Sequence, residues 1–158
     1  MKVILQRVKE ASVRIRGEIN SRIREGMCLL VGIEKGDTER DAEYLARKVA
    51  ELRVFPDEEG KMNRDLSEIK GQVLAVSQFT LAGSLKKGRR PSFDKAEYPE
   101  RAEKLFDYFV ERIRQKGIQV ETGIFGALME VHLVNDGPVT FILEPKKPKN
   151  TKESFPKP

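Results

Sequence analysis

Apolar and polar residues alternate in the first part of the chain, a pattern typical of strands with one buried face. It predicts a strand over residues 3–8 and two further arms within residues 13–23, joined by a turn at Gly17-Glu18. Residues 27–33 form an unbroken apolar run of strand length. Such a run predicts a central strand that is buried on both faces.

Two segments instead carry apolar residues at the three- and four-residue spacing of a helix. The first is capped by Asp37 or Thr38, of which Thr38 stands in capping-box spacing with Asp41, and its predicted end is Phe55-Pro56. The second begins at Pro99 and ends at Lys116-Gly117, where glycine suits a helix C-terminus. The predicted core stripes are Ala42, Leu45, Ala46, Val49 and Leu52, then Ala102, Leu105, Phe106, Phe109 and Ile113.

The remaining segments complete an α+β pattern. Further strands are predicted at residues 73–76, 118–122, 127–134 and 139–143. The polar residues 57–71 predict a loop. We expect a single α+β domain over residues 1–145, an antiparallel-rich β-barrel or sheet with two main helices packed on it. Residues 146–158 are rich in proline and lysine and predict a disordered tail.

The strand pattern near the C-terminus is interrupted by Asn135-Asp136-Gly137-Pro138-Val139-Thr140. Asp-Gly between apolar runs predicts a hairpin turn. Pro138 changes this expectation, because it has no N–H for a ladder and its bond to Gly137 adopts the cis form at modest cost. We therefore expect a stiff loop with exposed carbonyl groups, which is a candidate recognition device.

Composition limits the environment and the partners of the chain. Its 158 residues carry a formal net charge of +5 and include one cysteine and one histidine. A basic chain favours an anionic partner, nucleic acid above all. One cysteine excludes an intramolecular disulfide and suits a reducing cytoplasm. The N-terminus turns polar too soon for a signal peptide and no apolar run is as long as a membrane span, so we expect a cytoplasmic protein without membrane contact.

Side chains suited to catalysis are scarce. Cys28 lies inside the apolar run and is expected to be inert. His132, on an alternating strand, is expected to face solvent or to be satisfied by local partners rather than to be catalytic. The sequence has no zinc cluster, phosphate-binding glycine loop or dinucleotide fingerprint, and Asp57-Glu58-Glu59 lacks the spacing of a calcium loop. The prediction is chemistry without metal or cofactor, by backbone N–H groups and positioning or by a group of the substrate itself.

Two neighbouring stretches are the best candidates for a site. Ser77, Gln78 and Thr80 follow a predicted buried strand, where polar side chains either build a site on a rigid scaffold or cap the strand end. The next loop is the best candidate for phosphate contact, since it carries the cations Lys86, Lys87, Arg89 and Arg90. Further along, Phe125 stands between two glycines, where it lines a pocket or packs in the core.

The motifs Ser77-Gln78-Phe79-Thr80-Leu81 and Asn135-Asp136-Gly137-Pro138-Val139-Thr140 together resemble the motif pair of the D-aminoacyl-tRNA deacylases. Their flanks agree, namely Gln6-Arg7-Val8, Arg90-Pro91-Ser92-Phe93 and Thr122-Gly123-Ile124-Phe125-Gly126-Ala127. The resemblance covers residues 1–145. It implies a homodimeric hydrolase with active sites at the subunit interface. Such an enzyme cleaves the ester between a D-amino acid and the terminal adenosine of tRNA, and also mischarged glycyl-tRNA.

The resemblance also implies how the wrong enantiomer is excluded. In the family the Gly-Pro bond is cis and reaches into the pocket of the partner subunit. Carried over, the carbonyl groups of Gly137 and Pro138 would hold the α-amino group and leave no room for an L-side chain. Arg7 would brace this loop by hydrogen bonds, and Phe125 would belong to the substrate pocket.

The first motif would carry the bond cleavage. Backbone N–H groups of Phe79 and Thr80 would stabilise the oxyanion, Gln78 would orient the substrate, and Ser77 belongs to the same catalytic segment. No base is expected beside the Thr80 hydroxyl, so the ribose 2′-OH of the substrate is expected to help activate water.

Two other functions fit the residues alone. One is an RNA-binding module without catalytic activity, suggested by the basic loop of residues 86–90, which predicts salt-sensitive RNA binding without turnover. The other is a metabolite-binding homo-oligomer that uses an intersubunit cleft, which predicts no tRNA binding at moderate salt. Hydrolysis assays on D- and L-aminoacyl-tRNA separate all three functions.

Overall fold

Strand β1 (Lys2–Ile15) has neighbours along both edges in the computed structural model, which describes residues 1–146. Along one edge its first half pairs with β3 (Gly26–Gly32) and its second half with β2 (Glu18–Ile23), both antiparallel. The other edge pairs antiparallel with β8 (Glu130–Leu143). The two strand arms predicted near the N-terminus and the turn between them are confirmed.

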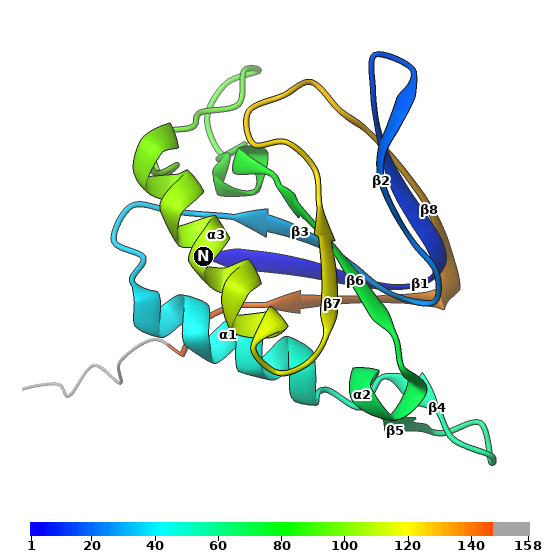
Figure 1. The fold of residues 1–158 in the computed structure, drawn as a ribbon. Helices are drawn as coiled ribbons and strands as arrows, with labels where there is room; N and C mark the ends of the chain where they lie inside the picture. Colours follow the sequence, from blue (N-terminus) through cyan, green and yellow to red (C-terminus); the bar gives the residue numbers. More distant parts are fainter. Residues whose placement is uncertain (147–158) are drawn as a thin grey trace, which may run out of the picture.

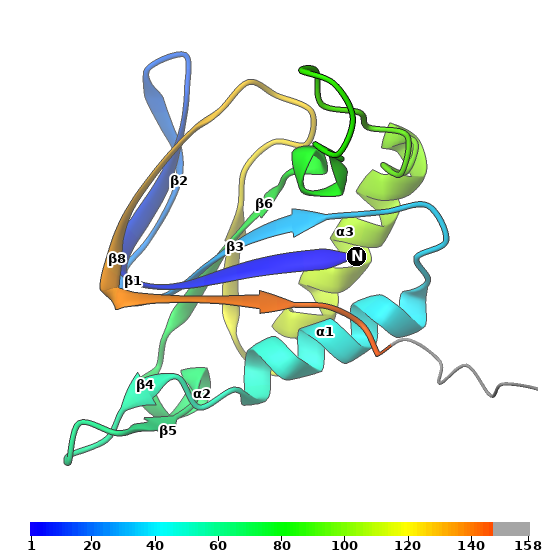
Figure 2. The ribbon, with the colours of Figure 1, turned by 180° about the vertical axis from the view of Figure 1, so that it is seen from behind.

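Two parallel strands extend the sheet beyond β3. The order is β2-β1-β3-β6-β7, with β6 (Gln72–Ser77) parallel to β3 and β7 (Gln119–Thr122) parallel to β6. The sheet is strongly curved and nearly closes on itself (Figures 1 and 2). This sheet and its two main helices confirm the predicted α+β, barrel-like fold.

The helices α1 (Glu39–Glu51) and α3 (Pro99–Arg114) lie side by side against one face of the sheet (Figure 2). The predicted capping box of Thr38 and Asp41 is present, and Pro99 stands in the first turn of α3. Alternate residues of β1, β3 and β6 face the helices in the main core, and intervening residues such as Cys28 and Leu74 form a second cluster on the other face. Burial on both faces explains why β3 and β6 are unbroken apolar runs.

The segment after α1 is more regular than its polar sequence predicts. It holds three short elements, β4 (Phe55–Pro56), β5 (Met62–Arg64) and α2 (Leu66–Ile69). The prediction of a loop over residues 57–71 is therefore wrong in part, and α1 already ends at Glu51. Hydrogen bonds from the backbone N–H groups of Lys61 (3.0 Å) and Glu59 (2.9 Å) to the Asp57 carboxylate fold the β4–β5 turn and lower the pKa of Asp57.

The hairpin turn that Asp136-Gly137 alone would indicate is not present at residues 135–138. Strand β8 runs through this stretch, and both of its arms pair with β1 rather than with each other. The register shifts on either side of Val8 mark the bulge, and the Asn135 amide closes it by accepting from Val139 N–H (3.0 Å) and donating to the Thr140 hydroxyl (3.1 Å). Within the bulge the Gly137–Pro138 bond is cis and both residues are exposed.

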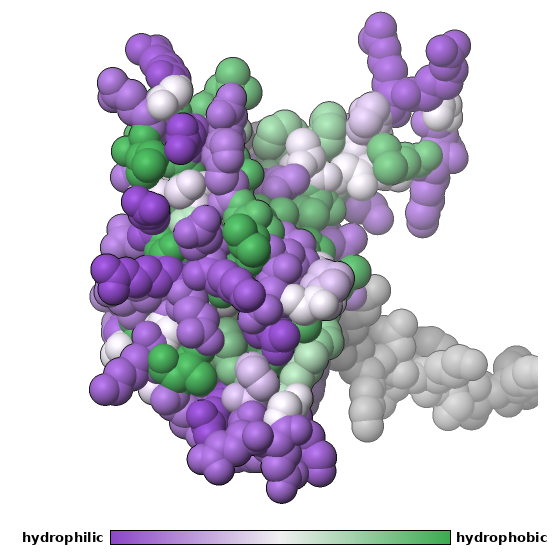
Figure 3. All heavy atoms as spheres, turned by 90° about the vertical axis from the view of Figure 1, so that its right-hand side faces the viewer, coloured by the Kyte–Doolittle hydropathy of each residue, from purple (hydrophilic) through white to green (hydrophobic). Residues whose placement is uncertain are grey.

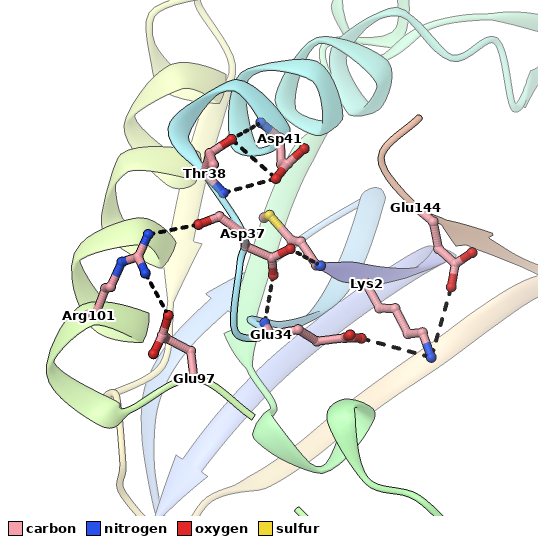
Figure 4. Close-up of polar contacts among 9 residues, drawn as sticks. Lys2, Glu34, Asp37, Thr38, Asp41, Glu97, Arg101 and Glu144 are labelled. Carbon is pink, nitrogen blue, oxygen red and sulfur yellow. Dashed lines mark hydrogen bonds and ion pairs between the residues drawn. The ribbon is translucent and has the colours of Figure 1, made fainter. Parts of the chain in front are cut away.

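Asp37 joins three elements at the start of α1. Its buried carboxylate accepts hydrogen bonds from the N-terminal ammonium of Met1 at 2.5 Å and from the backbone N–H of Glu34 at 2.6 Å. Its carbonyl accepts from the guanidinium of Arg101 on α3 at 3.0 Å (Figure 4). These contacts tie the start of β1 to both helices.

Two expectations concern the surroundings of this fold. Among residues 1–146 no helix is long and apolar enough to cross a membrane. The predicted disordered tail at residues 146–158 lies, from residue 147 onward, outside the described part of the chain.

Candidate active site

A cavity of ≈ 660 Å³ opens where β6 ends, beside the short 3-10 helix η1 (Phe79–Ala82) and the N-terminus of α3. Figure 1 shows the ribbons of β6 and α3. Its walls come from segments that are distant in the sequence: the end of β6 with η1, the stretch before α3, and the loop after β7. The predicted site residues in its lining are Ser77, Gln78, Phe79, Thr80 and Phe125. The fold thus brings the first candidate stretch and Phe125 to one cavity.

The backbone at the start of η1 leaves two donors free. Gln78 N–H donates to Val31 O at 2.8 Å, and Leu81 N–H to Gln78 O at 3.3 Å. Between them, the N–H groups of Phe79 and Thr80 have no hydrogen-bond acceptor within residues 1–146. The first N–H groups of a helix lack a preceding turn to donate to, so η1 presents a pair of donors suited to a carbonyl oxygen that gains negative charge.

The Thr80 hydroxyl is not arranged as an activated nucleophile. It accepts a hydrogen bond from the Gln78 side-chain amide at 3.1 Å. Within the described chain, no carboxylate or imidazole hydrogen-bonds to this hydroxyl, whereas an activated hydroxyl needs a base within that reach. The side chain of Gln78 therefore positions Thr80 and cannot ionise it.

Aromatic rings surround the cavity. Phe125 both lines it and packs against Phe106 of the core, with ring centroids 6.3 Å apart, so the two alternatives for this residue hold together. The ring of Phe79 packs edge-on against the ring of Phe93, with the ring centroids 5.1 Å apart. The lining also contains residues that were not singled out as site residues from the sequence, because only the tertiary fold brings them here, among them Lys35, Phe93, Glu97 and Tyr98.

The remaining implied substrate residues lie elsewhere in the chain. Gly137, Pro138 and Arg7 do not line the cavity. The Arg7 guanidinium is mostly buried and donates to Asp136 O at 3.1 Å and to Val54 O at 2.7 Å. Arg7 therefore anchors the start of the bulge, through Asp136 instead of through the carbonyls of Gly137 or Pro138.

The predicted phosphate loop is exposed beside the cavity. Lys86 and Lys87 line a separate depression of ≈ 300 Å³ that shares Asp94 with the cavity. Arg89 and Arg90 are exposed but do not line it. None of these four cations has an ion-pair partner within residues 1–146, so their charge is available to an anion.

Other candidate catalytic groups are excluded by their surroundings. Cys28 is fully buried, and burial raises the pKa of its thiol to about 12. His132 is exposed on β8 and lies 3.4 Å from Glu130, which agrees with the predicted solvent-facing position. Residues 1–146 contain no group of three or more side chains placed to hold a metal ion.

Apolar side chains are exposed along β8 and the loop before it. Leu128 is 94% exposed, Ile142 68% and Val134 46%. Figure 3 looks onto the side that carries β2, β1 and β8, and apolar side chains lie there among hydrophilic ones. Contiguous patches of exposed apolar residues are typical of protein–protein contacts, whereas single exposed apolar residues are common on any protein surface.

Two N–H donors without an acceptor in the described residues, beside a cavity whose Thr80 hydroxyl has no base hydrogen-bonded to it, suit enzymes that act on esters and other acyl groups. The family described as D-Tyr-tRNA(Tyr) deacylase matches residues 4–144. A relative named D-aminoacyl-tRNA deacylase from Bacillus cytotoxicus is 59% identical over 92% of this chain and 100% of its own length. Another of that name from Syntrophomonas wolfei is 54% identical over 93% of this chain and 99% of its own length.

Solved structures agree with this match. A protein named c-Myc DNA unwinding element binding protein is 42% identical, with a TM-score of 0.87 over 93% of this chain and 100% of that one. A probable eukaryotic D-amino acid tRNA deacylase, 17% identical, shares the fold with a TM-score of 0.78 over 90% of this chain and 98% of that one. The chain belongs to the D-Tyr-tRNA(Tyr) deacylase family. The resemblance and the predicted enzyme class, a hydrolase acting on aminoacyl-tRNA, are confirmed.

Proposed function

We propose that this protein hydrolyses the ester bond between a D-amino acid and the terminal adenosine of tRNA, releasing the free D-amino acid and tRNA. Mischarged glycyl-tRNA is a second substrate. Family membership supports the substrate class. The observation that carries the proposal is the pair of free N–H groups at Phe79 and Thr80, beside a cavity whose hydroxyl has no base.

The reaction needs little from side chains. Water attacks the ester carbonyl carbon, and the oxygen that becomes an oxyanion accepts hydrogen bonds from the N–H groups of Phe79 and Thr80. The ribose 2′-OH relays a proton from the water to the departing 3′ oxygen as the carbon–oxygen bond breaks. Gln78 orients the substrate and its terminal nucleotide, and Ser77 and Phe125 complete the walls around them.

Chirality is set by the bulge of β8. The carbonyl groups of Gly137 and Pro138 hold the α-amino group of the substrate and occupy the space that an L-side chain would need. Glycine has no side chain to exclude, so glycyl-tRNA is accepted. The exposure of both residues and the anchoring of the bulge by Arg7 support this role.

The enzyme acts as a homodimer with its active sites at the subunit interface. Gly137 and Pro138 do not line the cavity of their own chain, and in this proposal a second copy supplies them. The exposed apolar residues of β8 and the preceding loop support an interface on that side. A C2 dimer places each bulge on the equivalent surface of its partner, and therefore forms two sites at once.

The tRNA backbone is held by the basic loop. Lys86, Lys87, Arg89 and Arg90 are exposed beside the cavity and are unpaired within residues 1–146, which suits contact with phosphates. The substrate places the enzyme in the cytoplasm, where charged tRNA is used.

Hydrolysis of matched D-tyrosyl-, L-tyrosyl- and glycyl-tRNA tests the function. We expect rapid release from the D-tyrosyl and glycyl substrates and at least about 100-fold slower release from the L-tyrosyl substrate. Equal rates on the two enantiomers would refute the chiral role of Gly137 and Pro138. Salt-sensitive tRNA binding without release of the amino acid would favour an RNA-binding module. Absence of both tRNA binding and amino-acid release would favour a metabolite-binding oligomer.

A further inference from the structure

Tyr98 is an exposed aromatic residue at the rim of the cavity. It is 70% exposed, lines the cavity and is the N-cap residue of α3. Helices prefer Ser, Thr, Asp or Asn at this position, because those side chains satisfy a free N–H. The Tyr98 side chain makes no such capping bond. Helix stability therefore does not explain why a large ring stands here.

The ring is held in place by its neighbours. The Lys35 ammonium lies 5.1 Å from the ring centroid, within range of a cation–π contact. Lys35 N–H donates to Lys95 O at 2.8 Å, and Glu97 N–H donates to Ile33 O at 3.1 Å. These bonds join the two segments that carry the cation and the ring. With Lys35 over one face and most of the residue exposed, the other face is open to a flat ligand.

More cations lie next to this ring. Lys95 joins Lys86 and Lys87 in the lining of the ≈ 300 Å³ depression beside the cavity. Both hollows share Asp94, so a chain leaving the cavity meets the ring and the lysines within a short distance. Aromatic rings for bases, interleaved with cations for phosphates, are how proteins hold single-stranded nucleic acids.

We propose that Tyr98, backed by Lys35, is a stacking platform for the unpaired base that precedes the terminal adenosine of tRNA. The lysine-lined depression takes the adjoining phosphate. This inference rests on the proposed function, in which the aminoacylated adenosine occupies the cavity. Tyr98 is a positioning residue, because its contact lies one nucleotide away from the ester.

Kinetics with a long and a short substrate test the platform. D-tyrosyl-tRNA contains the preceding base, whereas 3′-O-(D-tyrosyl)adenosine lacks it. Tyr98→Ala should raise KM for the tRNA about tenfold with kcat unchanged, since loss of one stacked base costs this much. It should leave kcat/KM for the adenosine ester unchanged, and Tyr98→Phe and Tyr98→Trp should behave like the wild type. Met62→Ala, which removes another exposed apolar side chain on the distant β5, should change neither.

Binding of short RNA gives a readout that does not depend on hydrolysis. An uncharged oligonucleotide with the unpaired tRNA 3′ end should bind Tyr98→Ala about tenfold more weakly than wild type, and an abasic site at the preceding position should remove this difference. Two results would overturn the platform. One is an equal loss of kcat/KM by Tyr98→Ala on both esters, and the other is the same difference in affinity between wild type and Tyr98→Ala for the abasic RNA. So would unchanged KM and RNA affinity in a Tyr98→Ala protein with a normal thermal melt. If the wild type cleaves neither ester but the base-dependent binding is found, the proposed function fails and the platform stands.

Discussion

At the residue scale, the buried thiol of Cys28 shows how position decides chemistry. Burial in β3 raises its pKa to about 12, whereas an unfolded cysteine ionises near pH 8.5. Above about pH 8.5 the unfolded chain therefore loses this proton before the folded chain does, and stability falls as pH rises towards 12. We predict that the unfolding free energy of the wild type falls relative to Cys28→Ala by roughly 2 kcal/mol between pH 8 and pH 10. Urea denaturation at each pH measures this difference, and parallel curves would contradict it.

The Thr80 hydroxyl carries a second prediction. It accepts from Gln78 and has no base beside it, so Thr80→Ala should keep its kcat for D-tyrosyl-tRNA within about tenfold of wild type. A substrate with a 2′-deoxy terminal adenosine should instead be deacylated about 100-fold or more slowly, because a proton relay usually contributes that much to the rate. Single-turnover deacylation measures both rates. An inactive Thr80→Ala with normal cleavage of the deoxy substrate would make Thr80 a nucleophile and exclude the 2′-OH relay.

Sequence reasoning predicted single residues best where the reason for their placement is local. The position of Cys28 in an apolar run and of His132 on an alternating strand were enough to predict burial and exposure. The anchoring of Arg7 on Asp136 O and Val54 O could not be predicted in this form. Its partners lie far away in the sequence, and which carbonyl lies within reach depends on how β1 and β8 are paired.

At the element scale, η1 depends on close packing against β3. A Cβ added to Gly32 would lie 2.8 Å from the Leu81 Cβ and 3.1 Å from Gln78 O, so η1 would have to move. We predict that Gly32→Ala lowers kcat by about 10- to 100-fold, because small displacements of catalytic donors are costly. Gly60→Ala is a matched control, since its φ of +80° strains the backbone but its Cβ would meet nothing. Gly60→Ala should be less stable than wild type but keep its kcat. An unchanged kcat in Gly32→Ala would contradict the prediction and show that η1 tolerates the shift.

The junction of β1 with the helices depends on the buried carboxylate of Asp37. Asp37→Ala leaves the fully buried ammonium of Met1 without its partner, and breaking one side of a buried pair costs about 3–5 kcal/mol. Asp41→Ala, four residues on, removes only the exposed capping box (Figure 4) and should cost about 1 kcal/mol. Thermal and urea unfolding of the two variants measure the contrast. Equal losses would mean that the ammonium–carboxylate pair contributes little.

Helices with a clear hydrophobic periodicity or a helix-capping residue could be predicted from the sequence. Features that depend on which strands pair with each other could not. The capping box of α1 and the proline of α3 act within a few residues, which explains why their starts are confirmed. The Asp-Gly signal in β8 was misleading because both arms of the strand share β1 as a partner, and the Asn135 side chain takes over the hydrogen bonds that a turn would have made. Local turn chemistry thus produced a bulge in a continuous strand.

At the scale of the whole molecule, one chain contains both halves of the proposed site but does not bring them together. The free N–H groups of Phe79 and Thr80 lie beside the cavity, and Gly137 and Pro138 do not line it. The two motifs could be recognised in the sequence, but their separation within one chain is a property of the fold. Under the proposed function, assembly of two chains is the step on which activity depends.

Mixing two defective variants tests that assembly. Gln78→Ala impairs the cavity, and Gly137→Ala impairs the bulge, because Gly137 has a φ of +134° and an added Cβ would lie 2.7 Å from the Val139 side chain. Each homodimer should be at least about tenfold less active than wild type on D-tyrosyl-tRNA. In a mixed dimer, one site combines the intact cavity of the Gly137→Ala chain with the intact bulge of the Gln78→Ala chain. Co-expression should therefore restore about a quarter of wild-type activity, since about half of the dimers are mixed and each has one intact site. Activity equal to the mean of the two homodimers, with a dimer mass by light scattering, would place cavity and bulge in the same chain.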